Sequence, residues 1–267
     1  RLSTHSRGLS KRIDVPGTRH GNQSILISDG MPSNYELFQL ACPHLAESYG
    51  RLRDLFAPGE TPLDVLDIGA GDGTLSYSIA SHAPQHRYTL VDIDSEQVGL
   101  QRQRFSGSIE ARHVCRDAND FLSSLSDASI DIVTSTHCLH NLTQEYRATS
   151  FCSIRRVLRS GGRFFLLDKV ARDEPLHSQD LAWQIGDFTR RFRDLGRADL
   201  AREWTEHYLQ DNESHLRFEE ATLLSDLTKV GFRAQLRFRL RLEALIVCEV
   251  PGSISSSCPT TQMDHSL

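Results

Sequence analysis

Residues 63–74 read LDVLDIGAGDGT, an apolar run that passes into a glycine-rich loop. The glycines of the loop fall at every second position: Gly69, Gly71 and Gly73. Because glycine has no Cβ atom, such a loop lets the backbone approach a ligand closely. Two carboxylates flank it, Asp67 just before the loop and Asp92, which follows Gly73 by 19 residues. This interval is close to the one at which an acid meets ribose hydroxyls in nucleotide-binding folds.

The spacing of the loop argues against a dinucleotide site. The dinucleotide fingerprint G-x-G-x-x-G requires glycine at its sixth position, where this sequence has Thr74. Asp67 would repel a pyrophosphate, but it suits a cationic or aminoacyl group. One carboxylate beside an amine and a second, Asp92, on a ribose describe a nucleoside that bears an amino acid.

The elements that must position these residues alternate between strand and helix. Strands are predicted at 63–68, 87–93, 109–115, 129–135 and 163–169, with helices at 73–83, 95–105, 118–125 and 143–158. This alternation implies a parallel sheet with right-handed crossovers and helices on both faces. Two further strands, 233–241 and 243–250, are joined so closely that they must pair antiparallel. The sequence therefore predicts an α/β fold.

The remaining segments differ from this pattern. The expected boundaries are a flexible arm at 1–32, two short helices in 34–56 separated by Pro43, a helical stretch at 177–210, a helix at 217–232 ending at Gly231, and a disordered tail at 251–267. The folded domain is expected to span 33–250.

Composition excludes few functions. Of the 267 residues, 39% are hydrophobic and 24% charged, as is usual for globular proteins, and the net charge of −5 gives no general reason to expect nucleic acid. No run approaches the roughly 18 apolar residues of a membrane helix, and no signal peptide is recognisable. Six cysteines without CxxC spacing predict buried free thiols, no metal site and a cytoplasmic protein.

Five motifs carry a resemblance to a known family. They are VLDIGAGDG (65–73), YTLVDID (88–94), VCRDANDF (114–121), DIVTSTHCLHNL (131–142) and VLRSGGRFFLLDK (157–169). In this order and spacing they resemble the successive motifs of class I S-adenosylmethionine-dependent methyltransferases, and the resemblance covers about residues 60–250. It implies a Rossmann-like seven-stranded sheet, mostly parallel with the last strand antiparallel. It also implies S-adenosyl-L-methionine as cofactor and a helical lid insert at about 171–216.

The resemblance assigns roles in cofactor binding. Asp67 and the start of the loop correspond to residues at the methionine end, and Asp92 to the ribose-binding acid. Asp117 corresponds to the residue that recognises the adenine amine, a role compatible with capping a helix. Asp94 either assists or faces water. The implied set is Asp67, Gly69, Ala70, Gly71, Gly73, Asp92, Ile93, Asp117, Ala118, Ser135, Thr136 and, from the N-terminal arm, Tyr35.

Catalytic candidates follow from the chemistry. Methyl transfer needs alignment above all, and a base is required only if the acceptor atom must lose a proton. His137, after the fourth strand, is one candidate base. His215, in a stretch (212–232) similar to one in such methyltransferases, is the other, with helix capping or a surface position as the alternative. His140 is expected to pack under the next helix.

Other side chains leave alternatives open. Asp168 and Lys169 end the fifth strand, where they either touch the acceptor or are exposed. The aromatic positions of the insert form either core or pocket: Trp183, Phe188, Phe192, Trp204, His207, Tyr208 and His215. Three alternating arginines form either a solvated face or a site for an anionic acceptor or RNA: Arg237, Arg239 and Arg241.

The favoured function is methyl transfer to O, N or C of a small-molecule acceptor in biosynthesis. The aromatic insert supports it. An RNA-linked enzyme, either a tRNA methyltransferase or a carboxy-S-adenosylmethionine synthase, is the first alternative, and the arginine clusters favour it. The second is a catalytically inactive cofactor-binding partner subunit. A homodimer is compatible with all of them, and no membrane association is expected.

Overall fold

A computed structural model of the chain describes residues 40–59, 61–107, 109–213 and 217–252. Two predicted site residues, Tyr35 and His215, lie outside the described residues. So do the predicted arm at 1–32 and the tail at 251–267 apart from its first two residues.

The centre of the fold is one sheet whose strands are ordered β3-β2-β1-β4-β5-β8-β7. The strands are β1 (Asp64–Ile68), β2 (Arg87–Asp92), β3 (Ala111–Cys115), β4 (Ile130–Thr136), β5 (Leu158–Ala171), β6 (Phe218–Glu219), β7 (Arg233–Leu240) and β8 (Glu243–Glu249). Neighbours from β3 to β5 run parallel, and β8 is antiparallel to both β5 and β7. The predicted α/β class, with a mostly parallel sheet and an antiparallel last strand, is confirmed.

The predicted count of seven strands is wrong by one. β4 ends at Thr136, which lies opposite Leu167, whereas β5 continues to Ala171. The short strand β6 pairs with the extension of β5, with Phe218 opposite Val170. The sequence places these two residues in the helix predicted at 217–232, because two residues carry no periodic signal of their own.

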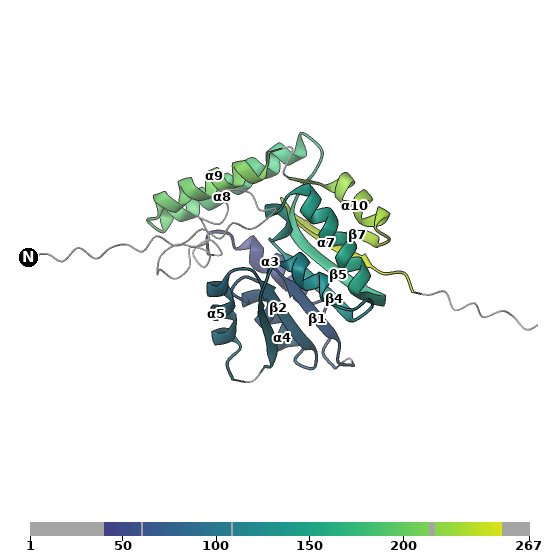
Figure 1. Ribbon diagram of the computed structural model, residues 1–267. Helices are drawn as coiled ribbons and strands as arrows, with labels where there is room; N and C mark the ends of the chain where they lie inside the picture. The colour runs from purple at the N-terminus through teal and green to yellow at the C-terminus, as the bar shows by residue number, and fades with distance from the viewer. Residues whose placement is uncertain (1–39, 60, 108, 214–216, 253–267) are drawn as a thin grey trace, which may run out of the picture.

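Helices cover both faces of the sheet (Figure 1). α6 (Ala118–Ser123), α7 (Gln144–Val157) and α10 (Glu220–Lys229) pack on one face. α3 (His44–Arg53), α4 (Thr74–His82) and α5 (Ser95–Arg104) pack on the other. A short 3-10 helix, η1 (Leu139–Asn141), follows β4. The two apolar clusters that result hold the carboxyl ends of β1, β2, β4 and β5 in fixed register.

Between β5 and β6 lies a pair of helices, α8 (Leu176–Asp194) and α9 (Ala198–Asp211). Figure 1 shows them side by side across the top of the molecule. The sequence predicted one helical stretch; the break occurs at Gly196, whose φ of 71° ends α8. Most insert aromatics are core: Phe188, Phe192, Trp204 and Tyr208 are buried in a third cluster. Trp183 is 39% exposed.

Two surface predictions need correction. Arg237 is an extra residue in β7, because the register shifts between Leu236 and Phe238, and this bulge breaks the expected alternation of arginines. Arg239 departs from a solvated face, since its side chain is 12% exposed and donates to Glu220 Oε2 at 2.5 Å, whereas Arg237 and Arg241 are exposed. The five described cysteines are free thiols, but Cys115 and Cys152 are exposed rather than buried. They lie on an edge strand and on the outer side of α7.

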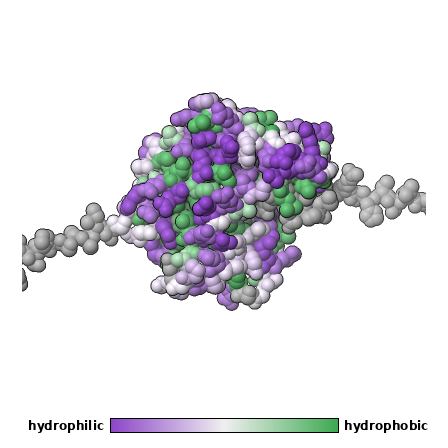
Figure 2. Space-filling model, turned by 180° about the vertical axis from the view of Figure 1, so that it is seen from behind, coloured by the Kyte–Doolittle hydropathy of each residue, from purple (hydrophilic) through white to green (hydrophobic). Residues whose placement is uncertain are grey.

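The molecular surface is mixed. Seen from behind, it is mostly hydrophilic or intermediate, with separated hydrophobic areas (Figure 2). Most of the large exposed apolar side chains lie on or beside α8 and α9: Leu176, Trp183, Leu195 and Leu209. Among the described helices, none combines the length and the apolar character needed to span a bilayer.

Candidate active site

The glycine loop follows β1 and opens α4. Gly69, Gly71 and Gly73 all have left-handed backbones, with φ of 68°, 54° and 76°. Residues other than glycine rarely adopt this conformation. At Gly69 there is a second reason, because an added Cβ would lie 2.1 Å from Sγ of Cys138. The sequence therefore specifies this loop locally, and the η1 segment packs directly against it.

Asp92 ends β2 and is tied to the loop. Its Oδ2 accepts a hydrogen bond of 2.8 Å from the backbone N–H of Gly71, and its Oδ1 accepts one of 2.9 Å from Asp94 N–H. Burial raises the pKa of Asp92, and these backbone hydrogen bonds oppose the rise. The backbone N–H of Ile93 is a third donor to this carboxylate. A carboxylate has about four lone-pair positions, so about one remains for a ribose hydroxyl. Ile93 follows, and its carbonyl accepts the Cys115 thiol at 3.5 Å.

Asp67 points into the protein. The residue is 8% exposed. Its carboxylate accepts hydrogen bonds from the hydroxyls of Ser76 and Thr134, the latter at 2.8 Å. Burial raises the pKa of Asp67 to about 6. The N–H groups of Gly69 and Ala70 both donate to Val91 O, at 2.9 and 3.1 Å. These contacts hold the start of the loop against β2 and β4.

Asp117 caps α6, as the capping alternative predicted. Its Oδ1 accepts from Asp120 N–H at 3.0 Å, while its Oδ2 accepts from the Tyr146 hydroxyl at 2.6 Å. Ala118 is the first residue of α6 and packs against the core. Tyr146, on α7, was missed, because nothing in the sequence pairs it with a residue 29 positions away.

Asp94 is likewise a cap. Its side chain accepts from Glu96 N–H at 2.8 Å at the start of α5, so it serves the helix rather than the ligand site.

The end of β4 carries buried polar atoms. Ser135 is fully buried, and Thr136 Oγ1 has no hydrogen-bond partner among the described residues. His137 follows with φ of 48°, the left-handed region that a residue with a side chain adopts only under constraint. Its N–H donates to Leu167 O at 2.9 Å, which fixes this conformation at the edge of the sheet.

His137 faces a glutamate that the sequence did not indicate. Its Nε2 lies 3.2 Å from Oε2 of Glu243, the first residue of β8, although the two atoms are not aligned for a hydrogen bond. Burial lowers the pKa of His137 to about 3 and raises that of Glu243 to about 8. Both groups are therefore uncharged at neutral pH. A single acid opening the apolar strand 243–250 was the only available signal.

His140 is buried, as expected, but it belongs to an ion pair. Its Nδ1 lies 2.5 Å from Oδ1 of Asp168, and its backbone N–H donates to Oδ2 of the same residue at 3.2 Å. Burial alone would lower the pKa of His140, yet the Asp168 and Asp211 carboxylates raise it. His140 is therefore a cation held by β5. The surface alternative for Asp168 and Lys169 is wrong, since they are 0% and 8% exposed.

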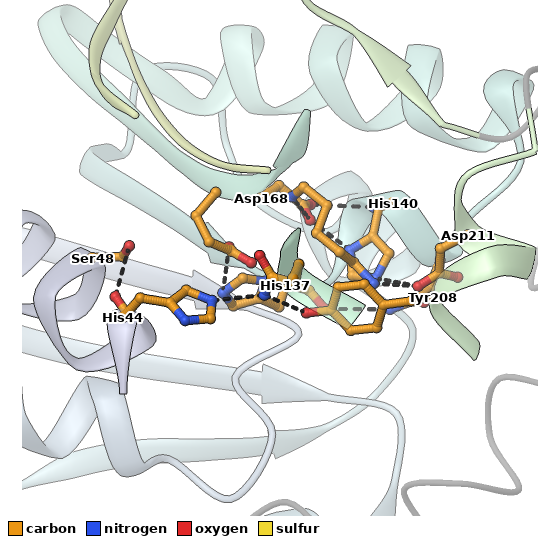
Figure 3. A network of polar contacts seen from close by, with 11 residues as sticks. His44, Ser48, His137, His140, Asp168, Tyr208 and Asp211 are labelled. Atoms are coloured by element: carbon orange, nitrogen blue, oxygen red, sulfur yellow. Dashed lines mark hydrogen bonds and ion pairs between the residues drawn. The ribbon is translucent and has the colours of Figure 1, made fainter. Parts of the chain in front are cut away.

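The end of α9 joins this cluster (Figure 3). The Lys169 ammonium donates to Asp211, and Nε2 of both His140 and His207 lies near Oδ2 of Asp211, at 3.5 and 3.2 Å. The two imidazoles and Asp211 place potential metal-ligand atoms within 4.8 Å of one another. The Lys169 cation already neutralises the Asp211 carboxylate, so the cluster is balanced as it stands.

A third polar group comes from α3 and α8. Gln184 Nε2 lies 2.6 Å from Nε2 of His44 and donates to the Tyr208 hydroxyl at 3.3 Å. In Figure 3, His137 appears between His44 and Tyr208. The sequence did not single out His44 or Gln184, since their meeting depends on how α8 packs.

Comparison with known proteins agrees with this arrangement. Residues 65–162 match the family described as a methyltransferase domain. The chain is 34% identical over 159 residues to malonyl-(acyl-carrier protein) O-methyltransferase of Geobacter sulfurreducens, covering 55% of this chain and 57% of that protein. It is 29% identical over 107 residues to ribosomal RNA large subunit methyltransferase G of Vibrio vulnificus, covering 37% and 27%. The chain thus spans less than two thirds of these relatives.

Among solved structures, the YcgJ protein of Bacillus subtilis matches with a TM-score of 0.52 at 16% identity, over 78% of this chain and 99% of that one. This match concerns the fold alone. The fold agrees with the domain match over residues 65–162, with the five motifs and with the glycine loop beside Asp92. The chain therefore contains a methyltransferase domain, and the domain match and the relatives support a class I S-adenosylmethionine-dependent methyltransferase.

Proposed function

We propose that the protein transfers a methyl group from S-adenosyl-L-methionine to a small-molecule acceptor by in-line displacement. The observation that carries the proposal is the hydrogen bond from Gly71 N–H to Asp92 Oδ2, which joins the glycine loop to an acid that keeps one acceptor position. The neighbouring strand end, at His137, provides an uncharged imidazole.

The residues fit the cofactor. Asp92 would bind the ribose, the backbone from Gly69 to Gly73 would face the nucleoside and methionine, and Asp117 with Ala118 would meet the adenine. When bound, S-adenosyl-L-methionine supplies a methyl group on a sulfonium, whose leaving group departs uncharged. The left-handed loop carries no side chain at Gly69, Gly71 and Gly73, and a Cβ added at Gly71 would meet nothing within 4 Å.

The protein's own part in the reaction is alignment and, for some acceptors, proton removal. His137 is the better base, because its neutral imidazole retains a lone pair. His140 is already protonated between two carboxylates, so it orders the strand ends instead. His215 remains a predicted second candidate.

A small acceptor is favoured over RNA by the setting of the site. His137 is 16% exposed in its side chain, and α8 and α9 pack over the adjoining strand ends. A base in a large folded RNA would not readily reach such a position. The names of the relatives include both an acyl-carrier substrate and ribosomal RNA, so the RNA-linked enzyme stays the second candidate. The homodimer and the cytoplasmic location remain predictions.

Calorimetric titration with S-adenosylhomocysteine tests the cofactor site, and transfer of a tritiated methyl group to a small-molecule extract or to total RNA tests the acceptor. We expect binding, and label in the small-molecule fraction. Label confined to RNA would favour the RNA-linked enzyme. If S-adenosylhomocysteine did not bind, both candidate functions would be contradicted.

A further inference from the structure

Two anomalies of the fold meet at one contact. The first is the left-handed backbone of His137, with φ of 48°. The second is the Glu243 carboxyl, which is fully buried and has no hydrogen-bond partner on either oxygen within the described chain. Their side chains approach to 3.2 Å. Constrained backbones and unsatisfied buried polar groups are both uncommon, and both concentrate at functional sites.

Glu243 is held firmly where it lies. It opens β8 and pairs in register with Lys169 of β5 and Leu240 of β7. The neighbouring Ala244 and Leu245 are fully or almost fully buried in the sheet. The carboxyl therefore comes from a backbone position that is paired on both sides within the sheet, and not from a flexible surface loop.

The charged and titratable groups that interact with Glu243 come from several elements. They are Cys42 before α3, His137 after β4, His140 of η1, Asp168 and Lys169 of β5, Tyr208 of α9 and Arg239 of β7.

The cations in this set already have partners. Lys169 binds Asp211, His140 binds Asp168, and Arg239 binds Glu220 on α10. No unpaired cation among the described residues is thus available to Glu243, and burial keeps it in the acid form with a pKa of about 8. A carboxylic acid donates one hydrogen bond, and the O–H of Glu243 makes none among the described residues, because His137 Nε2, although 3.2 Å away, is not aligned to accept it.

Other buried atoms nearby are also unsatisfied and uncharged. They are Thr136 Oγ1, His137 Nε2, His44 Nδ1 and Gln184 Oε1. Two lie at the end of β4, and the others come from α3 and α8. Burial lowers the pKa of His44 as it does that of His137, so neither imidazole carries charge at neutral pH. The group offers hydrogen bonds without offering a charge.

We propose that Glu243 and His137 form the acceptor subsite, in which Glu243 donates a hydrogen bond to an uncharged acceptor oxygen, a hydroxyl or a carbonyl. The inference rests on the proposed function, because it names the acceptor class of the same site. An ammonium group would find no unpaired carboxylate among the described residues around Glu243, because Asp168 and Asp211 are already bound to His140 and Lys169. A carboxylate would meet no free cation. Uncharged oxygen compounds remain, with His137 beside the atom that receives the methyl group.

The first test is spectroscopic and needs no acceptor. In the complex with S-adenosylhomocysteine, the infrared carbonyl band of a protonated carboxyl should be present at pH 7 and should disappear with a midpoint of about 8. The band should be missing in Glu243→Gln and unchanged in Glu249→Gln, which alters the exposed far end of the same strand. An ionised Glu243 at pH 7 would overturn the proposal.

The second test uses four probes titrated into the same complex: resorcinol, acetoacetyl-pantetheine, tryptamine and benzoate. We expect one of the first two to bind best. Glu243→Gln, which still carries a donor, should keep its affinity within about threefold, while Glu243→Leu should lose about tenfold, the value of one hydrogen bond. Preference for the amine or the acid, binding of none of the probes, or equal losses in both variants would overturn the subsite.

These outcomes are separable from failure of the proposed function. S-adenosylhomocysteine does not contact Glu243 in the proposal, so its affinity should be the same in all variants. If the wild-type protein fails to bind S-adenosylhomocysteine, the proposed function fails. If it binds normally and the probes or the infrared band disagree, only the subsite fails.

Discussion

The backbone N–H of Gly71 donates a 2.8 Å hydrogen bond to Oδ2 of Asp92. This contact joins two segments that lie 21 residues apart and makes the acid part of the glycine loop. It explains why the loop stays ordered at the end of β1 although three of its residues have left-handed backbones.

Replacing Asp92 by alanine should weaken binding of S-adenosylhomocysteine by about 1.5–3 kcal/mol, the range for hydrogen bonds to a charged group. The loop should also lose its anchor at Gly71. Isothermal titration measures the affinity. Asp94→Ala is the matched control, because Asp94 caps α5 and its loss should lower stability by about 1 kcal/mol with little effect on binding. Equal losses of affinity in the two variants would refute the ribose assignment.

Gly69→Ala should destabilise the protein by about 1–3 kcal/mol, since it combines a positive φ with overpacking. The new methyl group would meet Cys138 Sγ at 2.1 Å. Urea unfolding gives the difference. Gly186→Ala serves as control, because Gly186 lies in α8 with nothing within 4 Å of a Cβ and should gain up to about 1 kcal/mol. If Gly69→Ala left the free energy of unfolding unchanged, η1 would have to move easily away from the loop.

The local features of this site were accessible from sequence, and its long-range contacts were not. The glycine loop and the cap at Asp117 are specified by neighbouring residues, so pattern and turn chemistry suffice. Asp92 follows from its interval after the loop and from the family resemblance. The pairing of His137 with Glu243 depends instead on the register between β5 and β8. A lone glutamate at a strand start has no sequence signature that distinguishes it from a solvated one.

The same limit applies to the lid. The apolar spacing of α8 and α9 predicted helices, and their aromatics are mostly core. Nothing in the sequence indicated that Asp211 would reach Lys169, 42 residues earlier, or that this would bury both charges. The sequence therefore leaves Lys169 open between contact with the acceptor and exposure, because lysine is seldom buried unless it is paired.

Glu243→Gln should stabilise the protein increasingly as the pH rises. The folded-state pKa of Glu243, about 8, lies above the ordinary value of 4.5, so its contribution is fully present below about pH 4.5 and is lost as pH rises through 8. The advantage of the variant should approach about 3–5 kcal/mol at pH 9, at 1.36 kcal/mol per pKa unit. Urea unfolding from pH 5 to pH 9 measures the difference in free energy of unfolding between the variant and the wild type. In the control variant, Glu249→Gln, this difference should not change with pH. A difference independent of pH would contradict the buried acid.

Asp211→Asn should destabilise the protein by about 3–5 kcal/mol at pH 7, since it leaves buried cations unpaired. Burial alone would raise the pKa of Asp211, but Lys169 and His140 lower it. The contribution is therefore present above about pH 4 and lost as the pH falls further. Denaturant titrations at pH 7 and pH 3 measure the destabilisation and its pH dependence.

The control is Asp127→Asn, because Asp127 belongs to an ion pair in which its side chain is 77% exposed. This variant should change the free energy of unfolding by less than about 1 kcal/mol. Similar losses in Asp211→Asn and Asp127→Asn would contradict a structural role for the buried cluster.

His137→Asn separates proton transfer from backbone geometry, because asparagine tolerates the left-handed region better than most residues. The variant should fold normally and bind S-adenosylhomocysteine as the wild type does. If the acceptor loses a proton during transfer, turnover should fall about 10²–10⁴-fold, the usual share of a general base. Tritium transfer under saturating cofactor measures turnover. Normal turnover in His137→Asn would show that this imidazole is not the base.

His140→Asn is the comparison variant, because it removes a protonated imidazole. It should lower the stability of the fold. Normal stability in His140→Asn would show that its ion pair is not structural.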